Sequence, residues 1–393
     1  MNIQSTSLGS RIPFDTDKLD TLLDQAGIDI LVATSKHNVQ YLLGGYRFFF
    51  FDYMDAIGLS RYLPVLIYPK GRPDKAVFIG YGLEKYEKEL NRFWTPTADT
   101  SSRTSVGAVQ LAVAHIGNMG VASARIGVET AFLPMDAADT LRSAFAGGQI
   151  VDATVPLERL RARKSAEELA FLKEASERVV ASMRAAFAAA RPGMTKHEVV
   201  RHLRQQEVSR DLVFEYCLIT AGTSFNRAPS DQQLQAGDIM SLDSGANYHG
   251  YIGDLCRMGI LGQPDSELVD LLAEIETIQQ AARQPIRAGA RGGDIFARAE
   301  AVMHGTPNAS CLEFLAHGMG LVSHEAPRLT STGPVPYPGY DEDRALESGM
   351  VVSIETTMHH PKRGFIKLED TVAVTDGGWE GFGDAGRTWN VVA

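Results

Sequence analysis

The sequence predicts two domains: an α/β layer domain over residues 1–157, then a domain of long helices and paired strands over residues 158–393. Three observations predict this division. The chain has 393 residues, a length that suggests two domains or one large one. Helical and strand patterns alternate over residues 15–155, as in α/β layer domains. A long helical pattern over residues 158–190 then leads into the second domain.

Composition is that of an ordinary globular protein, with 44% hydrophobic and 22% charged residues. The formal net charge of −10 argues against nucleic acid as a main partner, because phosphate binding needs a basic surface. The three cysteines show no CxxC spacing, so we expect no disulfide framework and a cytoplasmic location. The first fifteen residues lack an apolar segment of signal-peptide length, and no apolar stretch is long enough to predict a membrane partner.

The first domain alternates helical spacing with short apolar runs. Two of these runs flank the turn at residues 69–74 and are expected to pair. Residues 37–43 are expected to form a turn with a short helix or strand. The other expected elements are helices over residues 17–26, 105–117 and 135–145, and strands over residues 29–33, 63–68, 75–79 and 125–128.

The second domain begins with the helical region over residues 158–190, in which charges separate the apolar positions. Arg191-Pro192-Gly193 breaks this pattern, and Thr195 is placed to cap a helix over residues 196–206. Further helices are expected over residues 266–288 and 292–303.

The stretch from Ala236 to Gly259 predicts two strands joined by a tight turn at Gly245 and Asn247. It carries Asp243 and Asp254. If the turn folds the strands together, both carboxylates reach the same end of the hairpin. Two buried carboxylates repel each other and lose hydration, and a divalent cation between them removes that problem. The hairpin therefore predicts half of a metal site.

Three more residues are suited to complete that site. Glu355 is expected to end the strand MVVSIE, and Glu369 to end the apolar strand in GFIKLED in the same way. His317 lies among glycines in AHGMGL. Together with the two aspartates they are the ligand mix for two divalent ions about 3.5–4 Å apart that share a water. Each residue alone also has an ordinary explanation, as a turn former, a hydrogen-bonded histidine or an acid on a solvated face. The apolar runs favour ligands, but spacing alone leaves both explanations open.

Several segments resemble the pita-bread metallopeptidases, which include methionine aminopeptidase, aminopeptidase P, prolidase and their relative creatinase. The similar pieces are LDSGANYHGYIGDLCRM, AHGMGLVSHEAP, VVSIE, GFIKLEDTVAV, LRARKSAEELAFLKEA and RPGMTKHEVV. The resemblance spans nearly the whole chain. It implies a creatinase-type α/β amino-terminal domain followed by an α+β pita-bread catalytic domain.

The same resemblance implies the roles of particular residues. It makes Asp243, Asp254, His317, Glu355 and Glu369 the metal ligands, with His324 as a second active-site histidine and Glu355 also as a proton carrier. It implies two divalent ions, of which manganese is our first expectation, with zinc, cobalt or iron as alternatives. A hydroxide formed on these ions would attack an amide or peptide bond, as in Xaa-Pro aminopeptidase and prolidase.

Some positions depart from the pattern of these peptidases. Asn226 and Glu313 stand where the peptidases carry histidines, and Lys367 stands where they carry an arginine. We treat these three as substrate-binding candidates. The departures leave a second hypothesis open, a hydrolase or lyase acting on a small amidine, amide, sulfonium or ammonium compound. A binding protein without catalysis is a third, and the full ligand set argues against it.

Residues 44–55 hold four consecutive phenylalanines beside Arg47 and Asp52. A buried strand is one explanation of this run. In dimeric relatives such as creatinase, this part of the first domain reaches the neighbouring subunit's active site. By that resemblance we expect a homodimer in which Arg47 contacts a small-molecule or short-peptide substrate.

Overall fold

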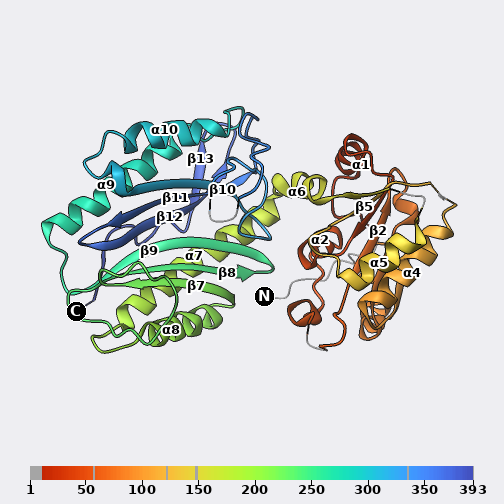
Figure 1. Ribbon diagram of the computed structural model, residues 1–393, viewed down its shortest axis with the longest axis horizontal. Helices are drawn as coiled ribbons and strands as arrows, with labels where there is room; N and C mark the ends of the chain where they lie inside the picture. The colour runs from red at the N-terminus through yellow and green to blue at the C-terminus, as the bar shows by residue number, and fades with distance from the viewer. Residues whose placement is uncertain (1–10, 56–57, 121–122, 147–148, 334–335, 393) are drawn as a thin grey trace. The chain divides into compact units, whose positions relative to one another are not determined.

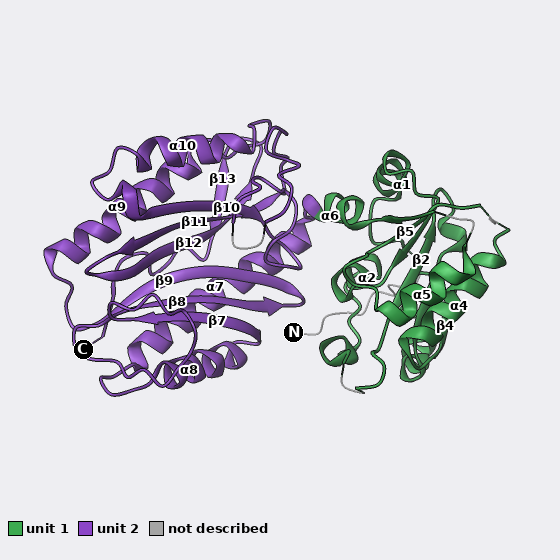
Figure 2. Ribbon diagram, viewed as in Figure 1, with its two compact units in different colours: residues 1–161 green, residues 162–393 purple. Residues whose placement is uncertain are grey.

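The computed structural model describes residues 11–55, 58–120, 123–146, 149–333 and 336–392 (Figure 1). The first ten residues, on which part of the expectation about a leader rests, lie outside this description. The chain divides into two compact units, Met1–Arg161 and Ala162–Ala393 (Figure 2). The expected boundary at residue 157 lies four residues before this division. None of the helices in the described part of the chain has the length and apolarity needed to cross a membrane.

Unit 1 is built on a six-stranded sheet with the strand order β4-β3-β2-β1-β5-β6. The pairs β1–β2 and β2–β3 are antiparallel, and the other neighbours are parallel. The strands are β1 Ile30–Ala33, β2 Val65–Pro69, β3 Val77–Tyr81, β4 Thr97–Ser102, β5 Ile126–Val128 and β6 Ile150–Asp152. The helices are α1 Thr16–Gln25, α2 Lys36–Leu42, α3 Lys85–Glu89, α4 Ser105–Gly117 and α5 Met135–Ala144.

Both faces of this sheet are covered. Leu31 and Ala33 of β1 pack into a core with α1 and α2, whereas Ile30 and Val32 pack on the other face with α4 and α5. Since successive residues of a strand point to opposite faces, a continuous apolar run is what a doubly covered strand requires. The predicted α/β layer organisation of this half is confirmed.

The helical region predicted over residues 158–190 consists of two helices, α6 Thr154–Ala162 and α7 Ala166–Ala189. The break has a local cause. The Ser165 side chain accepts from the backbone N–H of Glu168, and the Glu168 carboxylate accepts in return from the backbone N–H of Ser165, which starts a new helix at this point. Thr195 caps α8 Lys196–Ser209 in the same way, as predicted.

Unit 2 contains an eight-stranded sheet. Six strands follow the order β10-β11-β12-β9-β8-β7, with β13 paired to β12 and β14 paired to β9. They are β7 Val213–Ala221, β8 Ile239–Tyr248, β9 Tyr251–Leu261, β10 Leu312–Gly318, β11 Val351–His360, β12 Gly364–Val374, β13 Trp379–Phe382 and β14 Asn390–Val392. The remaining helices are α9 Ser266–Arg283, five residues shorter than expected, and α10 Gly293–Met303.

One face of this sheet carries the hydrophobic core of the unit. Leu242 and Leu255 pack with residues of α7 and α8, while Ile354 and Leu368 pack with residues of α9. Helix α7 comes very close to β9 at Gly253, where an added Cβ would lie 2.7 Å from the backbone of α7. The opposite face is therefore left for the polar residues that alternate with this core.

The predicted turn at Gly245 and Asn247 is wrong. Both residues lie within β8, and the two strands are joined by His249 and Gly250, whose φ angles are +53° and +91°. A two-residue turn with positive φ at both positions matches the twist of paired strands, and Gly supplies one of them at no steric cost. Gly245 serves packing instead, since a Cβ there would lie 2.4 Å from the ring of Tyr216.

The expectation that Glu355 and Glu369 end their strands is also wrong. β11 and β12 continue beyond both residues and pair along ten positions, from Val351 with Ala373 to His360 with Gly364. Both glutamates therefore lie in the interior of the sheet, where the backbone is held by ladder hydrogen bonds on both sides.

Candidate metal centre

The strand register places Asp243, Asp254 and Glu369 on one face of the sheet of unit 2. Cys256 lies directly opposite Asp243 on β8 and opposite Glu369 on β12. Directly paired residues share a face, so both acids point to the side of Cys256. Asp254 precedes Cys256 by two residues and therefore points the same way.

The two outer strands add the remaining predicted ligands to this face. Glu355 of β11 is the direct partner of Glu369, and Leu315 of β10 is the direct partner of Glu355. His317 follows Leu315 by two residues, so its ring lies on the same face. Five residues from separate parts of the sequence thus converge because five neighbouring strands, β8 to β12, keep a fixed register.

Ligand atoms of these residues come close together in three overlapping groups. Within each group, one ligand atom per residue lies within 4.8 Å of the others: Asp243, Asp254 and Glu369; His317, Glu355 and Glu369; and Asp254, His317 and His324. The two aspartates, His317 and Glu369 are almost fully buried. Their carboxylates need a positive partner, since an ionised acid in a buried site is otherwise costly.

Two buried ligand atoms fit a metal ion. His317 Nδ1 lies 3.2 Å from the carbonyl oxygen of Gly318, which can only accept, so a neutral ring carries its proton there. Nε2 then presents a lone pair to the acids, 3.6 Å from Glu355 Oε1. Neither this Nε2 nor Oδ1 of Asp254 has a hydrogen-bond partner among the residues that the structure describes. Buried polar atoms rarely lack one, and a nitrogen and a carboxylate oxygen are both ligands for divalent transition metals.

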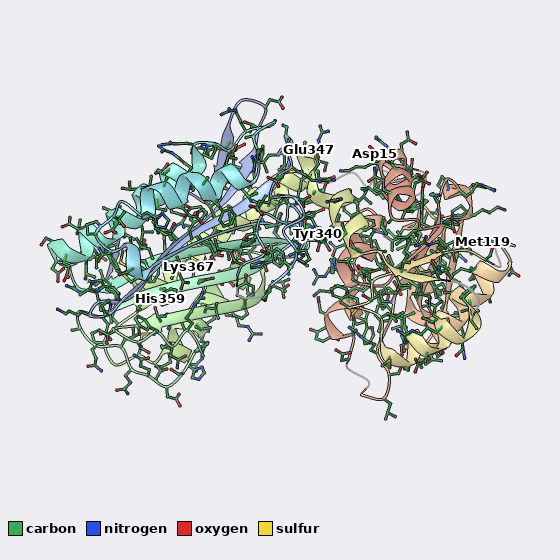
Figure 3. The ribbon with its side chains drawn as sticks, turned by 45° about the horizontal axis from the view of Figure 1, so that its top comes forward. Asp15, Met119, Tyr340, Glu347, His359 and Lys367 are labelled. Atoms are coloured by element: carbon green, nitrogen blue, oxygen red, sulfur yellow. The ribbon has the colours of Figure 1, made fainter. Side chains whose placement is uncertain are left out.

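The side chain of Lys367, which is labelled in Figure 3, contacts three of the same acids. Its ammonium is 2.7 Å from Asp243 Oδ2 and 2.8 Å from Glu369 Oε2, and it also contacts Glu355 Oε2. The lysine side chain is only 4% exposed. Sequence reasoning selected Lys367 as a substrate-binding residue, and the structure places its charge against three predicted metal ligands.

Burial and neighbouring charge set the protonation of the acids. Burial raises the pKa of Glu369 to about 7, with Lys367 opposing the rise. Burial also raises the pKa of Asp254 well above its usual value, and the charges of Glu369 and Asp243 add to this. For Glu355, burial acts in the same direction but is outweighed by Lys367 and His317, which hold its pKa below the usual range. Of Glu369, Asp254 and Glu355, the last therefore stays ionised most readily.

His324 lies on the loop after β10 with its ring stacked on that of His317, the ring centres being 3.7 Å apart. Burial and the neighbouring His317 lower the pKa of His324 to about 3. At neutral pH its ring is uncharged and offers one N–H donor and one lone pair. Glu325, the next residue, forms a buried ion pair of 3.0 Å with Lys164, which ties the loop to the segment before α7.

Two residues that sequence reasoning missed also reach the centre. The Arg227 guanidinium donates to Oδ2 of Asp243 and lies 5.1 Å from the ring centre of Phe365. Tyr216 of β7 lies opposite Gly245 with its pKa raised by burial and by the charge of Asp254. A signal for Arg227 was its place beside Asn226, but nothing in the sequence indicates which of two adjacent loop residues turns inward.

The other predicted substrate-binding residues lie outside this cluster. Asn226 is exposed, and its side-chain oxygen accepts from the backbone N–H of Ala228. Glu313 is exposed on β10, four residues and therefore about 13 Å along the strand from His317.

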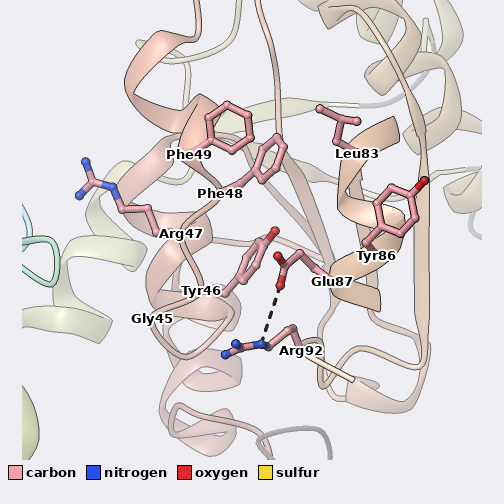
Figure 4. Close-up of a pocket in the computed structure, with 9 residues that line it drawn as sticks. All are labelled: Gly45, Tyr46, Arg47, Phe48, Phe49, Leu83, Tyr86, Glu87 and Arg92. Carbon is pink, nitrogen blue, oxygen red and sulfur yellow. Dashed lines mark ion pairs between the residues drawn. The ribbon is translucent and has the colours of Figure 1, made fainter. Parts of the chain in front are cut away.

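Arg47 belongs to unit 1, where it pairs with Asp52 and lines a hollow of about 570 Å3 (Figure 4). The phenylalanine run beside it is a short 3-10 helix, Phe49–Tyr53, and not a buried strand.

Beneath the centre, on the core face of the sheet, a buried ionic network surrounds Asp370. Its carboxylate lies 3.1 Å from Arg257 Nη1 and 3.0 Å from Arg283 Nη2, and it also pairs with Arg387. Arg257 in turn donates to the backbone oxygen of Glu369 at 2.7 Å. The network joins β9 and β12 directly under Asp254 and Glu369, and so holds the register that brings the ligands together.

Comparisons with known proteins agree with this fold. Sequence profiles match over residues 16–163, as a creatinase/prolidase N-terminal domain, and over residues 170–376, as metallopeptidase family M24. An uncharacterized peptidase of Bacillus subtilis, YqhT, is 25% identical over 92% of this chain and 95% of its own length. A Xaa-Pro dipeptidase of Pyrococcus furiosus is 28% identical over 56% of this chain and 63% of its own.

Solved structures show the same architecture. A dipeptidase from Pyrococcus horikoshii superposes with a TM-score of 0.79 at 21% identity, and a Xaa-Pro dipeptidase from Bacillus anthracis with 0.76 at 21%. Each covers 96% of this chain and 99% of its own. The predicted order, a creatinase-type domain followed by a pita-bread domain, is confirmed. With its second unit matched by the M24 profile across most of its length, the chain belongs to metallopeptidase family M24.

Proposed function

We propose that this protein is a divalent-metal-dependent hydrolase that cleaves a peptide or amide bond in a small substrate, in the manner of a Xaa-Pro dipeptidase. The observation that carries the proposal is a pair of buried ligand atoms among converging carboxylates. These atoms, Asp254 Oδ1 and His317 Nε2, have no hydrogen-bond partner in the described part of the chain. The names of the relatives support the substrate class, since a Xaa-Pro dipeptidase is among them.

Different residues of the centre would serve different steps of hydrolysis. Asp254, His317, Glu355 and Glu369 would hold the metal, which would lower the pKa of a bound water and so supply hydroxide near neutral pH. Glu355, to which the resemblance assigns the role of proton carrier, would accept the proton of the attacking water and return it to the leaving nitrogen as the carbon–nitrogen bond breaks. His324, held neutral, donates its N–H to the oxyanion of the tetrahedral intermediate.

A second candidate is a hydrolase or lyase acting on a small non-peptide compound. The residue types at Asn226 and Glu313 favour it, because the peptidases that this sequence resembles carry histidines at both positions. A peptide substrate would therefore not meet histidines at these two positions, as it does in the peptidases that this sequence resembles.

Assay of purified protein, stripped with a chelator and reloaded with Mn²⁺ or Co²⁺, separates these candidates. Release of free proline from Xaa-Pro dipeptides only after reloading, and its loss in Asp254→Asn, would support the peptidase. Metal-dependent turnover of small amides or amidines without dipeptide cleavage would favour the second candidate. Full activity in the stripped protein would contradict both.

A further inference from the structure

The ammonium group of Lys367 is fully engaged by acids of the centre. It has three N–H donors and three carboxylate neighbours, one each from Asp243, Glu355 and Glu369. These acids come from three different strands, so the ammonium lies inside the cluster and not at its edge. The side chain starts from β12 two residues before Glu369 and is buried along its length. Moving the ammonium away would leave a buried charge without partners, which is costly.

The same three oxygens cannot serve both the ammonium and a metal ion. A nitrogen at 2.7–2.8 Å from Asp243 Oδ2 and Glu369 Oε2 occupies the space in which a divalent ion would lie, about 2.0–2.2 Å from such atoms. Two cations in that space would also repel each other strongly. Oδ2 of Asp243 is further engaged by Arg227, so this side of the cluster already holds two positive charges.

A second group of ligand atoms remains on the His317 side. Asp254 Oδ1 and His317 Nε2 have no hydrogen-bond partner in the described residues. Glu355 Oε1 lies 3.6 Å from this nitrogen, and Glu369 Oε1, which also accepts from the hydroxyl of Ser353, lies 3.9 Å from it. These four atoms are enough for the first coordination sphere of one divalent ion with water.

The balance of charge in the centre also indicates a single bound ion. The four acids carry four negative charges when ionised, and Lys367 and Arg227 supply two positive ones. One divalent ion neutralises the remainder, whereas a second would need a further anion, such as a shared hydroxide, to balance its charge.

From these contacts we propose that Lys367 replaces one of the two ions expected from the resemblance, and that the protein binds a single divalent ion between Asp254, His317, Glu355 and Glu369. This inference rests on the metal-dependent function proposed above and specifies its cofactor. Asp243 is then a partner of two cationic side chains and not a ligand.

Counting bound ions tests the proposal. The protein is loaded with excess Mn²⁺, desalted and analysed by elemental mass spectrometry, with calorimetric titration as a second count. We expect one ion per chain in the parent protein and in the control Lys362→Met, which removes an exposed lysine on the β11–β12 connection. We expect two in Lys367→Met, where the uncharged side chain leaves the Asp243 side open. Two ions in the parent, or one in Lys367→Met, would overturn the proposal.

A second pair of variants decides the matter if Lys367→Met does not fold. Asp243→Asn and Asp254→Asn alter equally buried acids of neighbouring strands. We expect Asp243→Asn to keep its single ion, and Asp254→Asn to bind Mn²⁺ at least 10-fold more weakly, because only Asp254 is a ligand. Loss of the ion in Asp243→Asn would overturn the proposal.

The outcomes also separate this inference from the function on which it rests. Metal-dependent hydrolysis by a protein that binds two ions would support the proposed function and contradict the inference that Lys367 replaces an ion. Hydrolysis that needs no ion removes both.

Discussion

Glu355 and Glu369 are direct partners across β11 and β12, and both contact the ammonium of Lys367. Like charges opposite each other destabilise a sheet, so this pairing needs positive charge to persist. Lys367 supplies part of it from the same strand and face as Glu369. A bound cation would provide the remaining positive charge. The stability of the sheet is therefore expected to depend on whether a metal ion is bound at the centre.

Divalent ions are therefore expected to raise the melting temperature. A ligand that binds only the folded state stabilises it by an amount that grows with its concentration, by about 2.7 kcal/mol at 100 times its Kd. Thermal unfolding of the parent protein should shift upward with added Mn²⁺, and Glu369→Gln should abolish most of that shift. Glu380→Gln, an exposed acid on β13, should retain it. An unchanged shift in Glu369→Gln would contradict the assignment of Glu369 as a ligand.

His324→Ala should lose turnover but not metal. Removing one hydrogen bond to an oxyanion costs on the order of 10²–10³ in kcat. We expect a loss of that size, with the ion content unchanged, because His324 acts on the substrate. His304→Ala, an exposed histidine just after α10, is the matched control. If the ion content falls together with kcat, His324 is a ligand and the role given to it here is wrong.

Asp370→Ala should be strongly destabilising. It leaves Arg257, Arg283 and Arg387 without their shared carboxylate, and breaking a buried pair from one side costs about 3–5 kcal/mol. Urea unfolding in the presence of a chelator measures this loss apart from metal binding. Asp343→Ala, whose carboxylate is exposed and pairs with Arg291 at the surface, should change stability by less than about 0.5 kcal/mol. Equal effects of the two variants would show that the network is not structural.

The buried carboxyl group of Glu207 is expected to make the protein less stable as the pH rises from about 4.5 to about 8. It is buried at the end of α8 beside the hydroxyl of Ser244, and burial raises its pKa to about 8. Because this folded-state pKa lies above the unfolded value near 4.5, stability is fully present below pH 4.5. It then falls by about 1.4 kcal/mol per pH unit until the pH passes about 8.

The Glu207→Gln variant cannot ionise at this position. Its melting temperature should therefore be closer to that of the parent at pH 5 than at pH 9, where the variant should be the more stable. Circular dichroism melts at both pH values measure the difference. A constant difference between variant and parent would show that Glu207 does not titrate in this range.

Much of the ligand set was accessible from the sequence, because Asp243, Glu355 and Glu369 follow apolar runs in which a solvated acid has no place. The strand register that brings these acids together was not accessible from the sequence, because register depends on where the turns lie. The turn at His249-Gly250 has a histidine at positive φ, which no common turn pattern indicates. The orientation of the Lys367 side chain could not be predicted from the sequence either. Its ammonium contacts Asp243 of β8, which lies 124 residues away in the sequence. It also contacts Glu355 of β11, the strand paired with its own.

The most direct test of a metal centre in unit 2 is anomalous diffraction from crystals of the parent protein grown with Mn²⁺. The account predicts a strong anomalous peak about 2.0–2.3 Å from Asp254 Oδ1 and His317 Nε2. A protein that hydrolyses its substrate in the same buffer, yet shows no peak between these two residues, would contradict the account.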